Sequence, residues 1–172
     1  PGLERIAERF GNGSARDRAK PWLEPACGTG RYLRVIAARG RRAIGFDRSQ
    51  IMIDDANARL ARRGLDGLAK AVVTDMTDPV PAACPSRGAS FAFNPINSFR
   101  HLMTDADALA HLNGMARALV PGGVYAVGLS VTAYGLEPPS EDVWEARRGG
   151  LHVAHLVQYE PPTAPAATDP TK

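Results

Sequence analysis

The sequence predicts an α/β domain built on an open, doubly wound, mostly parallel sheet with helices on both faces. Short apolar runs alternate with segments of helical periodicity between residues 20 and 131, which is typical of parallel strands joined by right-handed crossovers. Polar residues stand near the carboxyl ends of the expected strands, where sheets of this class bind ligands. They are Glu24, Asp47, Asp75 and Asn94. The chain has 172 residues, 44% of them hydrophobic, which suits the core of one domain.

The first part of the chain is expected to form two strand–helix units after an N-terminal helix. Apolar residues at helical spacing predict the helices, and the runs PWLEPA and RAIGFD predict buried strands. Ser49 stands where a helix N-cap is needed, and Gly40 and Gly64 favour helix ends. In chain order the elements are a helix over residues 3–10, a strand over 21–26, a helix over 29–40, a strand over 42–47 and a helix over 49–64.

The second part continues the alternation and then changes character. Thr104 and Asp107 resemble a capping box, and an apolar stripe follows them at Leu109, Leu112, Met115, Ala116 and Leu119. PGG is expected to stop this helix, and Gly149-Gly150 predicts a hairpin turn. The expected elements are a strand over 69–75, a Pro-rich loop over 78–87, a strand over 89–94, a helix over 104–120, a strand over 123–131 and a hairpin over 143–159.

Composition disfavours several functional classes. The formal net charge is only +3 and the arginines are scattered, which disfavours nucleic-acid binding. No apolar run approaches the roughly 20 residues that cross a bilayer. Cys27 and Cys84 give poor material for disulfides, and His152 and His155 point to opposite faces of an expected strand. We therefore expect a cytoplasmic protein with free thiols and no metal site, and the sequence leaves a homodimer open.

The ends of the chain suggest a fragment. It begins at Pro1 without a methionine and finishes in a Pro/Ala/Thr-rich stretch without periodic apolar pattern, which predicts a flexible tail. We expect a single domain with a core over residues 20–131, a hairpin insertion and tail over 132–172, and a sheet that lacks its last strands.

The glycines after the first strand point to a ligand site. Gly28 and Gly30 let a ligand approach the main chain closely because they carry no β-carbon. Leu33 stands where the dinucleotide fingerprint has its third glycine, and the sequence contains no phosphate-loop motif. Glu24 suits a cation better than a phosphate, since carboxylates repel phosphate. The guest therefore need not carry phosphate.

Two further acids indicate a nucleoside. Asp47 ends the second strand, where it could accept hydrogen bonds from ribose hydroxyls. Asp75 could accept an adenine amino proton, while Met52 and Met76 supply soft apolar contacts to the ring. A zwitterionic nucleoside that carries a sulfonium group satisfies these conditions together with Glu24.

Four segments resemble, in order and spacing, motifs of the class I S-adenosylmethionine-dependent methyltransferases. They are LEPACGTGRYL, GFDRSQIMI, VTDMTD and ALVPGGVYAV, and the resemblance runs from about Trp22 to Val131. It implies a Rossmann-like fold, S-adenosylmethionine as cofactor with S-adenosylhomocysteine as product, and methyl transfer to a small-molecule acceptor. The stretch FAFNPINSFRHLMTDADALAHL is similar to the small-molecule N-methyltransferase branch, which favours an amine acceptor.

The resemblance also implies roles for particular residues. Those expected to bind the cofactor share the ends of the strands and the turns that follow them. Glu24, Ala26, Gly28 and Gly30 are expected to line the methionine part, Asp47 to hold the ribose hydroxyls, and Asp75 with Met76 to hold the adenine. Arg48 and Met52 are also expected to bind the cofactor. Asn94 would lie beside the methyl donor and His101 beside the acceptor, where an imidazole can take a proton at neutral pH.

Three alternatives remain open at this stage. The chain could be a non-catalytic or truncated cofactor-binding module that acts with a partner. A nicotinamide-dependent dehydrogenase is disfavoured by Leu33 and Glu24. FNPIN superficially resembles the Asp/Asn-Pro-Pro-aromatic segment of nucleic-acid amino-methyltransferases, but Ile96 and Asn97 replace the second proline and the aromatic residue.

Overall fold

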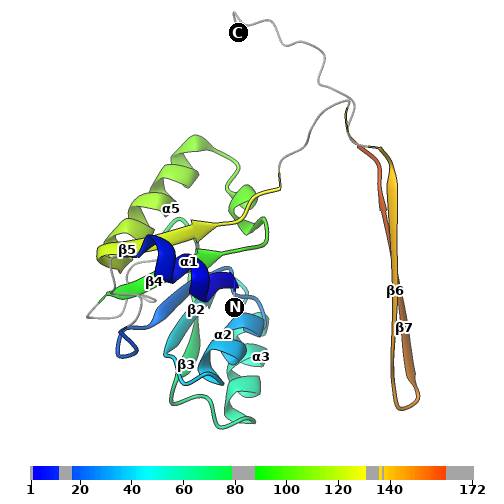
Figure 1. Ribbon diagram of the computed structural model, residues 1–172, viewed down its shortest axis with the longest axis horizontal. Coiled ribbons are helices and arrows are strands. Elements are labelled where there is room, and N and C mark those ends of the chain that lie inside the picture. The colour runs from blue at the N-terminus through cyan, green and yellow to red at the C-terminus, as the bar shows by residue number, and fades with distance from the viewer. Residues whose placement is uncertain (1, 12–16, 79–87, 131–135, 137, 162–172) are drawn as a thin grey trace, which may run out of the picture. The chain divides into compact units, whose positions relative to one another are not determined.

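The computed structural model describes residues 2–11, 17–78, 88–130, 136 and 138–161. Residues 79–87 of the expected Pro-rich loop over 78–87, which include Cys84, lie outside the described residues. So do the residues of the expected tail beyond 161. The chain divides into two compact units, Pro1–Leu129 and Ser130–Lys172 (Figure 1). We refer to them as unit 1 and unit 2. Within the described residues, no helix is both long and apolar enough to cross a membrane.

Unit 1 contains a parallel five-stranded sheet with the strand order β3-β2-β1-β4-β5. The strands are β1 (Trp22–Pro25), β2 (Ala43–Asp47), β3 (Ala69–Val73), β4 (Ala89–Asn94) and β5 (Leu119–Val127). The strand order reverses between β1 and β4, so this pair forms the topological switch point at which such sheets bind ligands. The predicted fold class, a doubly wound α/β sheet, is confirmed.

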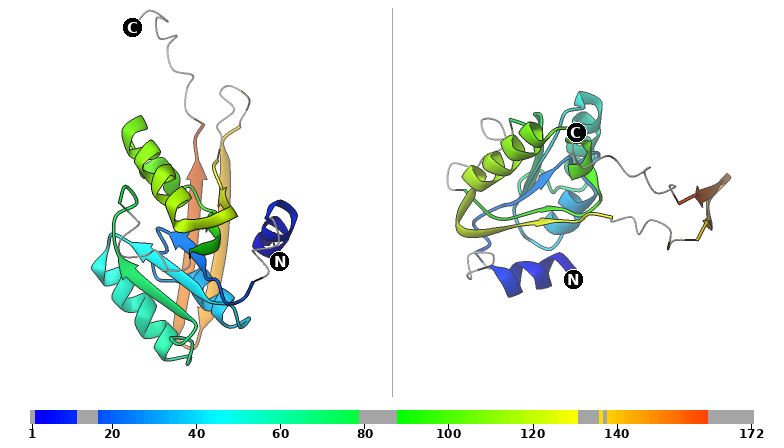
Figure 2. Two further views of the ribbon diagram at one scale, coloured as in Figure 1. Left: turned by 90° about the vertical axis from the view of Figure 1, so that its left-hand side faces the viewer. Right: turned by 90° about the horizontal axis from the view of Figure 1, so that it is seen from above.

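Helices cover both faces of this sheet (Figure 2). They are α1 (Gly2–Phe10), α2 (Arg31–Ala37), α3 (Gln50–Ala61), the 3₁₀-helix η2 (Ser98–His101) and α5 (Asp105–Ala118). One core joins α1, α2 and α3 to the sheet through buried residues such as Leu33, Leu60 and Phe91. The other joins α5 to the opposite face through Phe46 and Met115. The sheet is therefore buried on both sides.

The two predicted N-caps are confirmed. The Ser49 hydroxyl accepts the Met52 N–H at 3.4 Å, and the Thr104 hydroxyl accepts the Asp107 N–H at 3.1 Å. The Thr104 hydroxyl also donates to the Asp107 carboxylate at 2.8 Å, a side-chain contact in place of the backbone bond of a full capping box. Both hydroxyls satisfy amide groups that the first turn of a helix leaves unpaired.

The predicted buried face of α5 is partly wrong. Leu109 and Leu112 are 60% and 43% exposed, whereas His111 is completely buried together with Met115. The helix is rotated from the apolar stripe because both ring nitrogens of His111 have hydrogen-bond partners inside unit 1. A paired polar side chain can occupy a core position that an unpaired one could not.

The expected stop at PGG is also wrong. β5 begins at Leu119, directly after the helix, and the PGG residues lie within the strand. Pairing passes from Ala89–Leu119 to Phe91–Val124, so the ladder contains an irregularity at this point. Proline cannot donate a ladder hydrogen bond, and a bulge is one of the places where a strand tolerates it.

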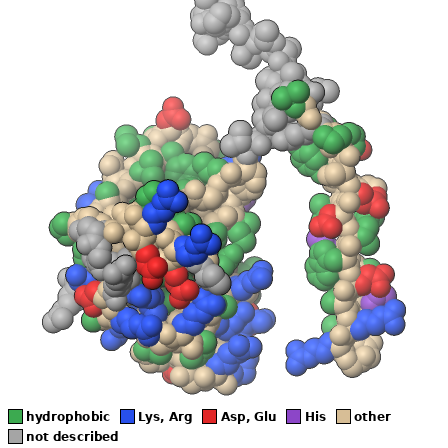
Figure 3. Space-filling view, in the orientation of Figure 1, with side chains coloured by type: hydrophobic (Ala, Val, Ile, Leu, Met, Phe, Trp, Pro, Cys, Tyr) green, Lys and Arg blue, Asp and Glu red, His purple; other side chains and the backbone are tan. Residues whose placement is uncertain are grey.

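Unit 2 holds an antiparallel hairpin of β6 (Ser140–Arg148) and β7 (Leu151–Tyr159). The predicted turn at Gly149 is confirmed, and this glycine has a φ of +58°. Every residue of both strands is exposed. Figure 3 accordingly shows hydrophobic side chains at the surface along the hairpin.

Candidate functional site

The turn after β1 is held in an unusual backbone conformation. Ala26, Gly28 and Gly30 all have positive φ, at 50°, 51° and 67°. A β-carbon on Gly28 would meet no atom within 4 Å, so this glycine faces open space. A β-carbon on Gly30 would lie 3.2 Å from that of Ala56. Gly28 therefore leaves room for a ligand, whereas Gly30 lets α2 approach α3.

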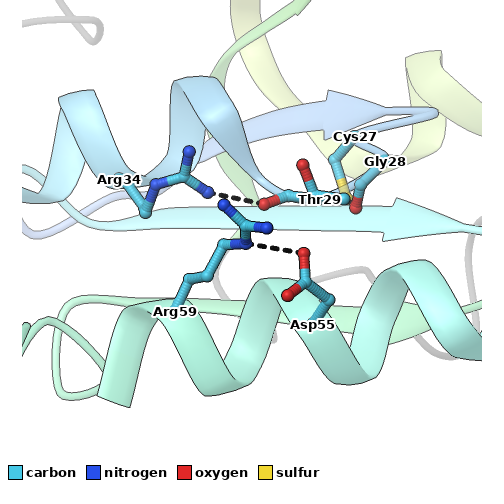
Figure 4. Close-up of polar contacts among 6 residues, drawn as sticks. All are labelled: Cys27, Gly28, Thr29, Arg34, Asp55 and Arg59. Atoms are coloured by element: carbon cyan, nitrogen blue, oxygen red, sulfur yellow. Dashed lines mark hydrogen bonds and ion pairs between the residues drawn. The ribbon is translucent and has the colours of Figure 1, made fainter. Parts of the chain in front are cut away.

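Two arginines make hydrogen bonds near this turn (Figure 4). The Arg34 guanidinium, on α2, donates to the carbonyl oxygen of Thr29 at 2.7 Å. On α3, Arg59 donates to the Asp55 carboxylate at 2.6 Å. The first contact ties the turn to its own helix, because Thr29 lies between the two glycines.

Asp47 joins the turns that follow β1 and β2. One carboxylate oxygen accepts the Gly28 N–H at 3.0 Å, and the other accepts the Ser49 N–H at 3.0 Å. A carboxylate has about four lone-pair positions, so each oxygen can still accept a hydrogen bond from a ligand. The bond to Gly28 spans 19 residues of sequence, and nothing in the local pattern indicates it.

A cavity of about 810 Å³ opens beside these turns at the carboxyl ends of the strands. Most of the predicted site residues line it, namely Ala26, Gly28, Asp47, Arg48, Met52, Asp75, Met76 and His101. It is completed by residues that were not predicted, namely Ser49, Thr77, Ser98, Leu102, Met103 and Asp107. Ser98 and Leu102 belong to the segment around His101, which the sequence did single out. Met103, just before α5, and Asp107, in its first turn, also lie within the stretch that resembles the N-methyltransferase branch, although no role was assigned to either.

Glu24, Gly30 and Asn94 do not line this cavity. Glu24 and Asn94 are buried, with 4% and 1% of their surface exposed. Within the described residues, one carboxylate oxygen of Glu24 and the amide oxygen of Asn94 have no hydrogen-bond partner. An unpaired buried oxygen costs about 1–3 kcal/mol. These two sit on β1 and β4, the pair at the switch point.

Burial also changes the acid–base chemistry beside the turn. Desolvation raises the pKa of Glu24 to about 8, so its carboxyl group is mostly protonated at neutral pH. Burial, followed by the charges of Glu24 and Asp47, raises the pKa of the Cys27 thiol. Cys27 therefore stays a neutral thiol.

Asp75 lies two residues beyond β3 and is exposed to the cavity. One of its oxygens accepts the Thr77 N–H at 2.9 Å and the Thr77 hydroxyl at 2.8 Å. These hydrogen bonds lower the pKa of Asp75. The residue thus stabilises its own turn with one oxygen, and the other oxygen remains available to a ligand.

Sequence reasoning missed two polar residues near the cavity, the buried His111 and the partly buried Tyr125. His111 contacts the main chain of Met76, which lines the cavity, and the hydroxyl of Tyr125. His111 lies one helical turn after Asp107 and outside the expected apolar stripe of this helix. His111 and Tyr125 both lie within segments that resemble the methyltransferases, but nothing in the sequence showed that they would meet.

A second cavity of about 390 Å³ is lined mainly by residues of α1 and α2. It includes Trp22 at the amino end of β1, with the Arg41 guanidinium 4.7 Å from the indole ring. None of the predicted site residues lines it. The predicted site residues that line either of these two cavities therefore all line the larger one.

Solved structures share this fold. DesVI from Streptomyces venezuelae aligns with a TM-score of 0.68 at 24% identity, covering 91% of this chain and 61% of that one. CalS10, described as an amino pentose methyltransferase from Micromonospora echinaspora solved with S-adenosylmethionine, aligns with a TM-score of 0.68 at 20% identity over the same shares. The chain thus spans 61% of the length of both proteins.

The glycopeptide N-methyltransferase MtfA, in complex with S-adenosylmethionine, aligns with a TM-score of 0.57 at 19% identity, covering 91% of this chain and 66% of that one. At these identities the likeness establishes the fold. The family follows from the sequence pattern of the methyltransferase domain, which matches residues 23–123 and so more than half of the chain. With the motifs, the parallel sheet and the matched pattern in agreement, this chain belongs to the methyltransferase domain family.

Proposed function

We propose that this chain binds S-adenosylmethionine in the 810 Å³ cavity and serves methyl transfer to a small-molecule acceptor, preferably an amine, with residues 20–131 as the cofactor-binding core and the hairpin as an insertion. The observation that carries the proposal is Asp47. Two main-chain amides hold its carboxylate at the cavity, and each oxygen keeps a lone pair for a ribose hydroxyl. Arg48 lies beside it in the cavity wall.

The methionine end of the cofactor fits the turn after β1. Gly28 and Ala26 present main chain to the cavity there, and Gly30 shapes the turn. Glu24 and Asn94 hold unpaired buried oxygens on the two strands at the switch point. A cationic group nearby would favour the ionised form of Glu24, whose protonated form burial otherwise stabilises. An ammonium and a sulfonium suit this site better than a phosphate.

The adenine end fits the part of the cavity lined by Met52, Met76 and Asp75. Met52 and Met76 line the cavity with polarizable side chains that suit the face of a flat ring. Asp75 keeps one carboxylate oxygen free of Thr77, and this oxygen can accept a hydrogen bond from an exocyclic amino group. The chain thus offers a contact for each part of a sulfonium nucleoside.

When bound, the cofactor supplies a methyl group on a sulfonium leaving group. The protein's task is then to orient the acceptor lone pair, exclude water and remove a proton. His101 is an exposed residue of η2 that faces the cavity, so its imidazole nitrogen is positioned to take a proton from a protonated amine. The descriptions of CalS10 as an amino pentose methyltransferase and of MtfA as an N-methyltransferase support the preference for an amine.

The test is a calorimetric titration of the chain with S-adenosylmethionine and S-adenosylhomocysteine, with a nicotinamide dinucleotide as a control ligand. We expect binding of the first two, a loss of at least about ten-fold in Asp47→Ala, and a smaller loss in Asp47→Asn, which keeps one acceptor oxygen. Asp54→Ala is the matched control, because this aspartate of α3 is bonded to Gln50 on the surface.

Each outcome has a consequence. Equal binding by Asp47→Ala and the unaltered chain would overturn the ribose role, and preferential binding of the dinucleotide would favour a dehydrogenase. Binding with methyl transfer only to acceptors other than amines would overturn the amine preference, and binding without methyl transfer to any small-molecule acceptor would favour a cofactor-binding module. Thermal unfolding of each variant shows whether a loss of affinity reflects a loss of folding.

A further inference from the structure

The buried histidine of α5 has a partner on each side of its ring. His111 is completely buried. Its Nδ1 lies 2.9 Å from the carbonyl oxygen of Met76, and its Nε2 lies 2.9 Å from the hydroxyl oxygen of Tyr125 on β5. The partners are 35 and 14 residues away in sequence. The histidine therefore links three separate parts of unit 1.

The chemistry of these partners fixes the direction of both hydrogen bonds. A carbonyl oxygen can only accept, so Nδ1 carries the proton. In the neutral ring Nε2 then holds a lone pair, and it accepts the hydroxyl proton of Tyr125. Burial lowers the pKa of His111, against the smaller opposing effect of the Met76 carbonyl, so the neutral form prevails at neutral pH. The ring is a fixed donor toward Met76.

His111 also contacts a second segment that lines the cavity, the 3₁₀-helix η2. The Phe99 ring lies 5.7 Å from the His111 ring in an edge-on arrangement. Phe99 belongs to η2, in which Ser98 and His101 line the cavity. One side chain therefore contacts the Met76 segment through a hydrogen bond and η2 through an aromatic contact. These segments line the same cavity, and His111 itself is not among its lining residues.

We propose that His111 is a positioning residue of the cofactor site, which holds the Met76 main chain through Nδ1–H and supports η2 through Phe99, and so fixes the wall that receives the adenine ring. The inference rests on the proposed function for the nature of the ligand. A residue needed only for packing would not require both ring nitrogens to be paired, and an aliphatic side chain of similar volume would avoid the cost of burying them.

Two substitutions separate the hydrogen bond from packing. The amide nitrogen of asparagine takes the place of Nδ1, so His111→Asn keeps a donor for Met76. The longer side chain of glutamine reaches the place of Nε2, so His111→Gln keeps the partner of Tyr125 and leaves the Met76 carbonyl unpaired. Both variants remove the ring that contacts Phe99. Asn113→Ala, at an exposed position on the same helix, is the control.

The affinity for S-adenosylhomocysteine is the first measurement. We expect the dissociation constant to rise about ten-fold or more in His111→Gln and to stay within about three-fold in His111→Asn, because an unpaired buried carbonyl costs about as much as a tenfold change in affinity. Thermal unfolding is followed in parallel. Equal affinities of both variants and the unaltered chain would make His111 a packing residue and overturn the proposal.

Amide hydrogen exchange without ligand is the second measurement. Exchange over residues 74–78 should speed up in His111→Gln but not in His111→Asn, whereas exchange over 98–102 should speed up in both. Exchange in α2 should not change. Unaltered exchange over 74–78 in His111→Gln would overturn the proposal even if the affinity changed. If the unaltered chain failed to bind S-adenosylhomocysteine, the proposed function would fall, and exchange would still decide whether His111 fixes the wall.

Discussion

The two units of this chain are stabilised in different ways. In unit 1, aromatic and aliphatic side chains such as Phe91, Phe46 and Leu33 are completely buried on both faces of the sheet. In unit 2, every residue of β6 and β7 is exposed. Burial of apolar surface is the main favourable contribution to folding. Unit 1 can therefore account for its own stability, whereas the hairpin depends on backbone pairing and cross-strand contacts.

The hairpin nevertheless has a defined side-chain pattern. Trp144 and His155 pair on one face, with ring centroids 4.9 Å apart. His152 lies 3.1 Å from the Glu145 carboxylate on the other face. Such pairs contribute roughly 0.2–1 kcal/mol each. An isolated two-stranded hairpin is marginally stable in water, so the comparison predicts independent and unequal responses of the two units to substitution.

The largest difference is expected between two aromatic substitutions. Phe91→Ala removes a ring whose centroid lies 4.8 Å from that of the Trp22 ring. It should lower the free energy of unfolding of unit 1 by about 3–5 kcal/mol. Trp144→Ala should change it by less than about 0.5 kcal/mol, because Trp144 is 48% exposed. Denaturant unfolding followed by circular dichroism measures both. A large effect of Trp144→Ala would show that the hairpin contributes to the core of unit 1.

A second contrast concerns buried and exposed carboxyl groups. The pKa of Glu24 is about 8 in the folded chain and 4.5 ordinarily, so the folded state binds the extra proton between these values. Its contribution to stability is complete below pH 4.5 and is lost as the pH rises through 8. Between pH 4.5 and 8, the free energy of unfolding of the unaltered chain should therefore fall on the order of a few kcal/mol more than that of Glu24→Gln.

Glu145→Gln provides the matched comparison in the hairpin. This carboxylate is exposed, and such ion pairs contribute about 0–1 kcal/mol. In the Glu145→Gln variant, the unfolding free energy of unit 1 should therefore depend on pH as it does in the unaltered chain. Unfolding free energies at pH 4.5, 6 and 8 measure both effects. If the unfolding free energies of the unaltered chain and of Glu24→Gln changed in parallel with pH, burial of Glu24 would not be the cause of the loss of stability.

The smallest contrast pairs a helix cap with a hairpin turn. Thr104→Ala removes the N-cap of α5 and should cost unit 1 about 1 kcal/mol. Gly149→Ala forces a β-carbon into a positive φ and should cost the hairpin about 1 kcal/mol. Hydrogen exchange reports each unit separately. Slower or unchanged exchange of β6 and β7 in Gly149→Ala would mean that the turn adopts another conformation.

Local features of the sequence determined which elements form and where many of them begin. β4 matches the predicted run over 89–94, and Ser49 and Thr104 cap their helices as predicted. The alternation of strands and helices predicted the parallel fold, and two of the four polar residues at strand ends, Asp47 and Asp75, line the cavity. These inferences succeed because capping, periodicity and turn chemistry depend on residues a few positions apart.

Tertiary structure decided which side chains meet. It joined Asp47 to Gly28, buried Glu24 and Asn94 outside the cavity lining, and turned His111 inward in place of Leu109. Each outcome depends on partners that are distant in sequence, such as the Met76 carbonyl that accepts the His111 proton. Apolar periodicity could not predict that His111 is buried, because the burial of a polar group depends on hydrogen bonds that only the folded chain brings together.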